Sequence, residues 1–219
     1  MKRLSQYCFA ALLVLIFTDA ASGLTLVVNC APVSGPTELA SAAILCPQFN
    51  LLGQTLSNIS IAVSGGITGS ITLTNGDNAP QTGSGTTTTG FSFGALTGFT
   101  FVNPIFSPSF TTGVQPIAAG QTITFSGLSA TGNGSLGSDT TSFAPYTGAG
   151  NFTIPVSTST FFSAGGTGGA FMASQSSQAN ATAVVTYTYA PPAVPEPVTL
   201  SLVGFGFVGL GLAAHKFRK

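Results

Sequence analysis

The chain has 219 residues, of which 28 are glycine and 5% are charged, and its five basic and five acidic residues give a formal net charge of zero. All five basic residues lie near the two termini: Lys2, Arg3, Lys216, Arg218 and Lys219. Between them, residues 24–190 hold no base and three acids, Glu38, Asp77 and Asp139. Because nucleic-acid binding depends on neutralising phosphates, this body argues against a nucleic-acid partner. The length indicates a single domain.

The N-terminus has the three parts of a secretory signal peptide. Its two basic residues precede an apolar stretch over residues 7–17, which is too short for a strong membrane span. Small residues then precede a predicted cleavage between Gly23 and Leu24, with a cut after Ala20 as the alternative. We therefore expect residues 1–23 to direct export across the inner membrane.

The exported region begins with an apolar run at residues 24–28, which predicts a first strand. Cys30 and Cys46 are the only cysteines of this region, and in an exported protein an isolated pair predicts a disulfide. The closed loop, of about 15 residues, would contribute on the order of 3 kcal/mol in the chain-entropy model. The single histidine, His215, lies in the C-terminal tail, so we expect neither a metal site nor a cofactor.

Within that loop, residues 36–45 predict a short helix. Pro36 would occupy its first turn, and Glu38 would be favoured by the positive end of the helix.

Strong alternation of apolar and polar residues begins at Ser57. The runs 57–63 and 70–74 alternate, and Ser64-Gly65-Gly66 lies between them, so we expect a hairpin with a glycine-rich turn. The threonine- and glycine-rich stretch 81–90 predicts a mobile loop or an edge strand.

Further short strands are expected along the rest of the body. Aromatic residues mark them at Phe91, Phe93, Phe99 and Phe101. Residues 121–125 predict a strand that closes at Ser126-Gly127, residues 132–137 a polar loop, residues 159–162 a short strand, and residues 181–189 the clearest strand of all. In this last strand Ala183, Val185, Tyr187 and Tyr189 alternate with Thr182, Thr186 and Thr188.

Short strands with regular turn signals and almost no helical periodicity predict an all-β fold. We expect an antiparallel β-sandwich over residues 24–190, and the sequence leaves a jelly-roll and an Ig-like topology both open. Rows of Thr and Ser on one face of each strand suit a sheet that faces water on one side.

The tail over residues 191–219 has three ordered parts. Pro195, Glu196 and Pro197 form a helix-excluding triplet. Residues 198–214 form an uncharged, glycine-rich run that, as a helix, would extend roughly 25 Å, near the lower limit for crossing a bilayer. The basic residues Lys216, Arg218 and Lys219 follow and are expected to stay on the cytoplasmic side.

This tail resembles the PEP-CTERM sorting signal of Gram-negative bacteria in its triplet, its Gly/Leu-rich span and its terminal basic group. The resemblance implies that an exosortase recognises Pro195-Glu196-Pro197 and cuts near it. The inner membrane would then hold the precursor only transiently, and the hydrophobic segment would be absent from the mature protein. The alternative is an ordinary single-span tail anchor that is never processed.

The body is similar to the choice-of-anchor E domains. The similarity lies in residues 49–56, in the strands that follow to Thr74, in the segment 146–150 and in the strand 184–189. It implies a β-rich extracellular module that carries a C-terminal anchor, here of the PEP type.

The chemistry needed by an enzyme is missing from the body. Without His, Lys or Arg it lacks a Ser–His triad, a lysine nucleophile and an arginine clamp. A glycosidase needs a pair of carboxylates, and the three acids are far apart in sequence. Each has a simpler interpretation: Glu38 begins a helix, Asp77 follows Asn75-Gly76 in a turn, and Asp139 lies in a polar loop.

We therefore expect a non-enzymatic protein of the cell surface or extracellular matrix, structural or adhesive in exopolysaccharide or biofilm. Its expected partners are an exosortase and the inner membrane, with extracellular polysaccharide as a further candidate. The alternative is a carbohydrate-binding module that recognises polysaccharide specifically, in which an exposed aromatic residue stacks on sugar.

Overall fold

The computed structural model describes residues 23–191. The predicted signal peptide up to residue 22 and the tail from residue 192, with Pro195, Glu196, Pro197, Lys216, Arg218 and Lys219, lie outside the described residues. Nearly all of the strand structure belongs to one compact unit, made of Thr25–Leu52 and Leu56–Tyr189. Among residues 23–191, no helix is long and apolar enough to cross a membrane.

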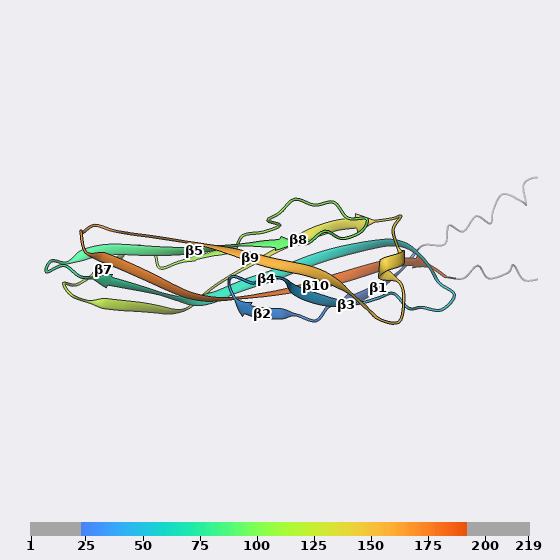
Figure 1. The fold of residues 1–219 in the computed structure, drawn as a ribbon, viewed down its shortest axis with the longest axis horizontal. Helices are drawn as coiled ribbons and strands as arrows, with labels where there is room; N and C mark the ends of the chain where they lie inside the picture. The colour runs from blue at the N-terminus through green and yellow to red at the C-terminus, as the bar shows by residue number, and fades with distance from the viewer. Residues whose placement is uncertain (1–22, 192–219) are drawn as a thin grey trace, which may run out of the picture. The chain divides into compact units, whose positions relative to one another are not determined.

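Over the described residues 23–191 the chain is all-β, as predicted, and one short 3-10 helix is the exception (Figure 1). The elements are β1 (Leu24–Asn29), β2 (Val33–Pro36), β3 (Ala42–Pro47), β4 (Thr55–Asn75), β5 (Gln81–Phe93), β6 (Ser109–Thr111), β7 (Gln115–Ile117), β8 (Thr122–Asp139), η1 (Ala144–Tyr146), β9 (Asn151–Gly166) and β10 (Phe171–Ala190).

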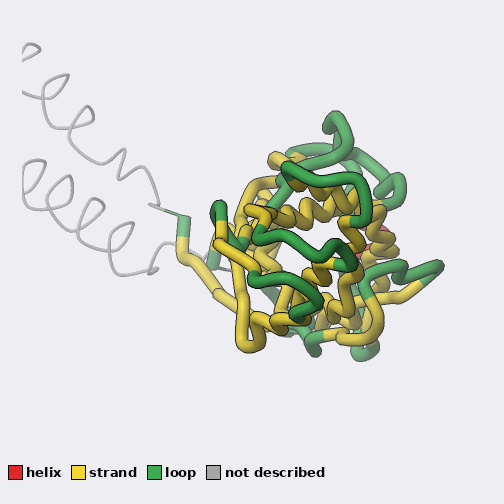
Figure 2. Tube along the Cα trace, turned by 90° about the vertical axis from the view of Figure 1, so that its left-hand side faces the viewer, coloured by secondary structure: helices red, strands yellow, loops and turns green. Residues whose placement is uncertain are grey.

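The strands form two antiparallel five-stranded sheets, which agrees with a β-sandwich. Sheet A has the order β1-β10-β4-β8, with β2 also paired to β10; sheet B has the order β3-β9-β5-β6, with β7 also paired to β5. Figure 2 shows the strands in yellow grouped around the interior, with the connecting loops in green. The choice between a jelly-roll and an Ig-like topology stays a prediction.

The core lies between the inward-facing rows of the two sheets. On β4 the buried residues alternate with more exposed ones, and on β10 Ala183, Val185 and Tyr187 are buried as their predicted pattern requires. The inward row of β4 is Ile59, Ile61, Val63, Ile67, Ile71 and Leu73, each at most 2% exposed. Since a buried aliphatic side chain contributes about 1.5–3 kcal/mol, this period-2 pattern fixes which face of each strand turns inward.

The predicted hairpin at Ser57–Thr74 is wrong, because β4 runs through Ser64-Gly65-Gly66 without a turn. Gly65 instead allows close packing against its backbone. A Cβ at this position would lie 2.7 Å from the Asn180 carbonyl oxygen and 2.9 Å from the Phe91 ring. The glycine pair is therefore a place where another strand and a core ring approach the backbone.

The predicted turn at Ser126-Gly127 and the predicted loop at 132–137 are also wrong, because both lie inside β8. The register against β4 shifts at Gly69/Ile71 and at Ile61/Ala62. Gly127 and Gly137 beside these shifts have φ of 70° and 96°. The glycines supply the left-handed conformation of β-bulges, so the strand bends and continues.

The predicted helix at residues 36–45 is wrong. The segment enters β2 and β3, and in β3 the buried Ile44 and Cys46 alternate with the exposed Leu45. Pairing of β3 with β9 provides backbone partners and core contacts that a short isolated helix would lack.

Two further predictions are corrected. Residues 81–90 belong to β5, an interior strand that pairs with β9 on one side and with β6 and β7 on the other. Phe99 and Phe101 lie in the loop between β5 and β6 rather than in strands. The predicted strands at 24–28 and 181–189 are confirmed, and the one at 159–162 is part of the longer β9.

Candidate functional site

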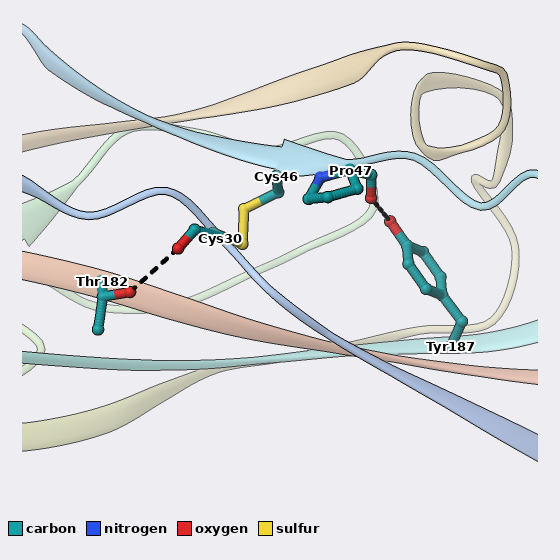
Figure 3. Close-up of a disulfide and its surroundings, with 5 residues drawn as sticks. All are labelled: Cys30, Cys46, Pro47, Thr182 and Tyr187. Carbon is teal, nitrogen blue, oxygen red and sulfur yellow. Dashed lines mark hydrogen bonds between the residues drawn. A yellow bond between two sulfur atoms is a disulfide. The ribbon is translucent and has the colours of Figure 1, made fainter.

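The predicted disulfide between Cys30 and Cys46 is confirmed (Figure 3). Cys30 follows β1 of sheet A, and Cys46 lies in β3 of sheet B. The residues are 5% and 0% exposed. The bridge therefore joins the two sheets covalently from within the core.

Hydrogen bonds surround this bridge, and one of them, from Tyr187 of sheet A to Pro47 of sheet B, also joins the two sheets. The Tyr187 hydroxyl of β10 donates to the Pro47 carbonyl of β3 at 2.7 Å, and the Cys30 N–H donates to the Ala183 carbonyl at 2.9 Å. Thr182 donates to the Cys30 carbonyl at 3.4 Å (Figure 3). Burial, and to a lesser extent the neighbouring Tyr146, raise the pKa of Tyr187 well above its ordinary value, so this phenol stays a donor. The disulfide and the Tyr187 hydrogen bond therefore have a structural role: they hold sheet A and sheet B together.

Of the three acids among residues 23–191, only Asp139 is buried, at 3% exposure, and its predicted place in a polar loop is wrong. It ends β8, where its carboxylate accepts bonds from the Thr141 N–H and from the Ser142 N–H, each at 2.9 Å. Burial raises the pKa of Asp139, but these hydrogen bonds outweigh it and hold the pKa below its ordinary value. The group is therefore an ionised anchor for the turn that follows β8.

The other two acids also accept hydrogen bonds from neighbouring groups. Glu38 lies in the loop after β2, not at a helix start, and accepts from the Thr160 N–H at 2.8 Å. Asp77 lies in the predicted turn and accepts from the Gln81 amide. Over residues 23–191 no three His, Cys, Asp or Glu side chains come together in a way that could hold a metal ion.

A depression of about 350 Å³ lies beside η1. Its lining contains no acid, base or thiol: Ala95, Leu96, Thr97, Pro145, Tyr146, Asn151, Phe152 and Thr153. The Tyr146 hydroxyl donates to the Thr97 carbonyl at 2.6 Å. Burial, and then the charge of Asp139, raise the pKa of Tyr146 to about 12. The phenol is thus neutral and already bonded, and the depression offers no proton-transfer group.

The best candidate binding surface is the outer side of sheet B around Phe161, which is 69% exposed. Phe161 pairs with Thr88, and Thr88 pairs in turn with Ser109. The Thr88 hydroxyl donates to the Ser109 hydroxyl at 2.9 Å, and in the next row Thr86 donates to Thr111 at 3.0 Å. We call these five residues the Phe161 face. It joins an exposed aromatic ring to hydroxyls held in place by strand pairing, and none of its residues is charged.

Phe161 was not singled out by the sequence, although a signal for it exists. Phe152, Ile154 and Val156 alternate as inward residues of β9. Continuing that alternation through Pro155 and the threonines places Phe162 inward and Phe161 outward. The short predicted strand at 159–162 did not connect to this longer pattern.

The predicted sorting residues Pro195, Glu196 and Pro197 lie outside the described residues. The predicted cleavage residues Gly23 and Leu24 are at the beginning of the described chain, where Leu24 opens β1. Cleavage between them stays a prediction.

No protein-family model and no curated protein matches this chain. Solved structures with partial similarity include three from infectious bursal disease virus. These three are the Gx strain structure (10% identity, TM-score 0.20, 78% of this chain and 38% of that chain), a T13 IBDV viral particle (9%, 0.22, 81% and 41%) and a VP2 subviral particle (13%, 0.21, 78% and 38%). This chain thus spans about two fifths of their length, and TM-scores this low do not establish a shared fold.

Proposed function

We propose that the chain is an exported, non-enzymatic protein of the cell surface or extracellular matrix, with a structural or adhesive role in exopolysaccharide. The observation that carries the proposal is the chemistry of the body. Its three carboxylates are each engaged in local hydrogen bonds, and it holds no histidine, lysine or arginine. The buried disulfide between the sheets suits an oxidising compartment outside the cytosol.

The sorting route in this proposal rests on the two ends of the chain. The signal peptide would direct export, and an exosortase would process the chain at Pro195-Glu196-Pro197. The processed body would then leave the inner membrane for the surface or the medium.

The test is the intact mass of the protein recovered from cells and from medium. A chain that starts near Leu24 and stops near the triplet is the expected result, two hydrogens lighter because of the disulfide. Replacing Pro195-Glu196-Pro197 by alanines should keep the full tail, whereas replacing Pro191 and Pro192, which precede the triplet, should leave processing unchanged. A wild-type mass that still includes Lys219 would refute exosortase processing, and immunogold labelling confined to the cytoplasm would refute export.

The second candidate function is specific recognition of an uncharged polysaccharide by the Phe161 face. Pyranose rings present C–H faces that stack on aromatic rings, and neighbouring hydroxyls fix orientation. The specific observation is that the exposed Phe161 lies in register with the fixed Thr88–Ser109 hydroxyl pair.

This candidate is tested with a glycan array and a pull-down on the producing organism's own polysaccharide. Phe161→Ala should abolish binding, because it removes the stacking ring. Met172→Ala is the matched control: it removes another exposed apolar side chain, 63% exposed, from β10 of the other sheet. Equal binding by wild type and Phe161→Ala would exclude the Phe161 face.

A further inference from the structure

Strand β8 is an edge strand along its whole length. It ends the order of sheet A and pairs with β4 alone. An edge strand exposes backbone N–H and C=O groups on its free side, which can pair with another chain. Long edges therefore need protection if a protein is to stay monomeric.

The usual protections are absent from most of β8. Residues 122–139 contain no lysine, arginine, glutamate or proline, and the terminal Asp139 is buried and turned to Thr141 and Ser142. The inner side is covered, since Ile105 and Phe106 occupy the space over Gly134 and Gly132. Strand β6 of sheet B also lies close to β8, but among the described residues β4 is the one strand that is hydrogen-bonded to β8 in a ladder.

The two bulges of β8 would distort an added strand, but they leave one regular stretch. Between the register shifts, Leu128 to Ser135 pairs with Gly69 to Ala62 of β4 without interruption. On its outer side Ser129, Thr131 and Asn133 are exposed. Their side chains make no hydrogen bond to any other residue of the described range.

The rest of the molecule shows how such a row of hydroxyls is used. Where two strands meet inside a sheet, facing threonines bond to each other, as Thr72 does to Thr124 at 2.9 Å and Thr74 to Thr122 at 3.0 Å. The same holds for Thr86 and Thr111 of sheet B. In the Leu128–Ser135 stretch of β8, Ser129 and Asn133 face Thr68 and Ser64 of β4 without bonding to them, and Thr131 faces Gly66. Their polar groups are therefore free to bond to a strand added on the other side of β8.

We propose that this edge pairs with the same edge of a second copy of the chain, antiparallel about a two-fold axis at Thr131. Thr131 then faces Thr131 of the second copy, and Ser129 faces Asn133 of the second copy. An isologous contact needs a self-complementary patch, and this one is uncharged, so two copies meet without like-charge repulsion. The pairing makes one continuous sheet from sheet A of both copies.

This inference rests on the edge alone and not on the proposed function. The contact would supply a cross-link between molecules in a matrix, but it would form equally in a protein with another role. A monomeric protein would leave the tests of export and polysaccharide binding untouched.

The test is sedimentation velocity of the exported protein, purified after expression of the full chain, over a wide concentration range. Wild type is expected to show a monomer–dimer equilibrium. Thr131→Lys places two lysines face to face at the axis and should weaken association at least about 100-fold. The matched control is Thr68→Lys, which adds the same charge to the same exposed face but on the interior strand β4, two residues from Gly66, the partner of Thr131; it should dimerise like wild type.

A second variant keeps the test decisive if a lysine disturbs folding. Thr131→Cys should form an intermolecular disulfide under mild oxidation, because its two copies face each other, whereas Thr68→Cys should not. The native cysteines do not interfere, since they are already bonded to each other. A wild type that stays monomeric at all concentrations, or equal weakening by Thr131→Lys and Thr68→Lys, would overturn the proposal.

Discussion

Removing the Cys30–Cys46 disulfide should lower the free energy of unfolding by about 3 kcal/mol. The two cysteines are 16 residues apart, and the chain-entropy model gives about 3 kcal/mol at 25 °C for closing a loop of this length in the unfolded chain. For a body of this size each kcal/mol shifts Tm by about 2–4 °C, so the expected decrease is about 6–12 °C. Because the bridge joins sheet A to sheet B, the loss should appear as a change in global unfolding.

The assay is urea denaturation of wild type, of wild type under reductant, and of the double variant Cys30→Ala, Cys46→Ala. Alanine avoids placing an unpaired hydroxyl in the core, which would add its own penalty. Reductant should destabilise wild type and leave the double variant unchanged. A loss below about 1 kcal/mol in both tests, a third of the chain-entropy value, would refute the reasoning that this bridge restrains the unfolded chain.

Four further predictions test other parts of the structure. Tyr187→Phe removes the bond to the Pro47 carbonyl and should cost about 1 kcal/mol in urea denaturation. Asp139→Asn removes the charge that accepts from two N–H groups and should cost about 1–2 kcal/mol at neutral pH. Because the folded pKa of Asp139 lies below its ordinary value of 3.8, the wild-type advantage is complete above that value and is lost as the pH falls through the folded pKa, so the two proteins should converge in acid. Tyr146, with its folded pKa raised from 10.0 to about 12, should contribute stability that is complete below pH 10.0 and is lost toward about pH 12, and an ultraviolet titration that shows it ionising near 10.0 in the folded protein would contradict its burial. Gly132→Ala would place a Cβ 2.6 Å from the Phe106 ring and should cost about 1–3 kcal/mol, whereas Gly165→Ala, with open space around it, should change stability little.

The sequence was sufficient for the fold class and for the disulfide, because both depend on local, countable features. Alternation of apolar residues with threonine identified the strand at 181–189, and the two cysteines of residues 24–190 leave one pairing. The inward row of β4 was likewise visible from Ile59, Ile61 and Val63. These sequence patterns predict the structure correctly because a half-buried strand has a fixed period of two.

Glycine was the main source of error, because one residue type serves three purposes. Gly65 gives room for Asn180 and Phe91, Gly127 supplies the positive φ of a bulge, and Gly53 has a positive φ in the loop before β4. Only the tertiary neighbours distinguish these cases, and a single sequence does not contain them. Interpreting Gly65 and Gly127 as turns therefore divided the long strands β4 and β8 into short ones.

The candidate surface depended on the same missing information. Phe161 and Phe162 are adjacent and chemically identical, and their roles differ only in which side of β9 each one takes. The edge position of β8 depends on strand order, which arises from contacts between residues far apart in the chain. The sequence pattern predicts individual strands, but which strands are neighbours and which lie at an edge can be learned only from the assembled sheets.

The absence of basic residues from the folded body has a consequence for its response to salt. Salt changes protein stability mainly by screening charge pairs and repulsions, and residues 24–190 carry only Glu38, Asp77 and Asp139. The acids are engaged with backbone and amide groups rather than with opposite charges. The fold should consequently be almost indifferent to ionic strength, so that it would remain equally stable in fresh water and in brine.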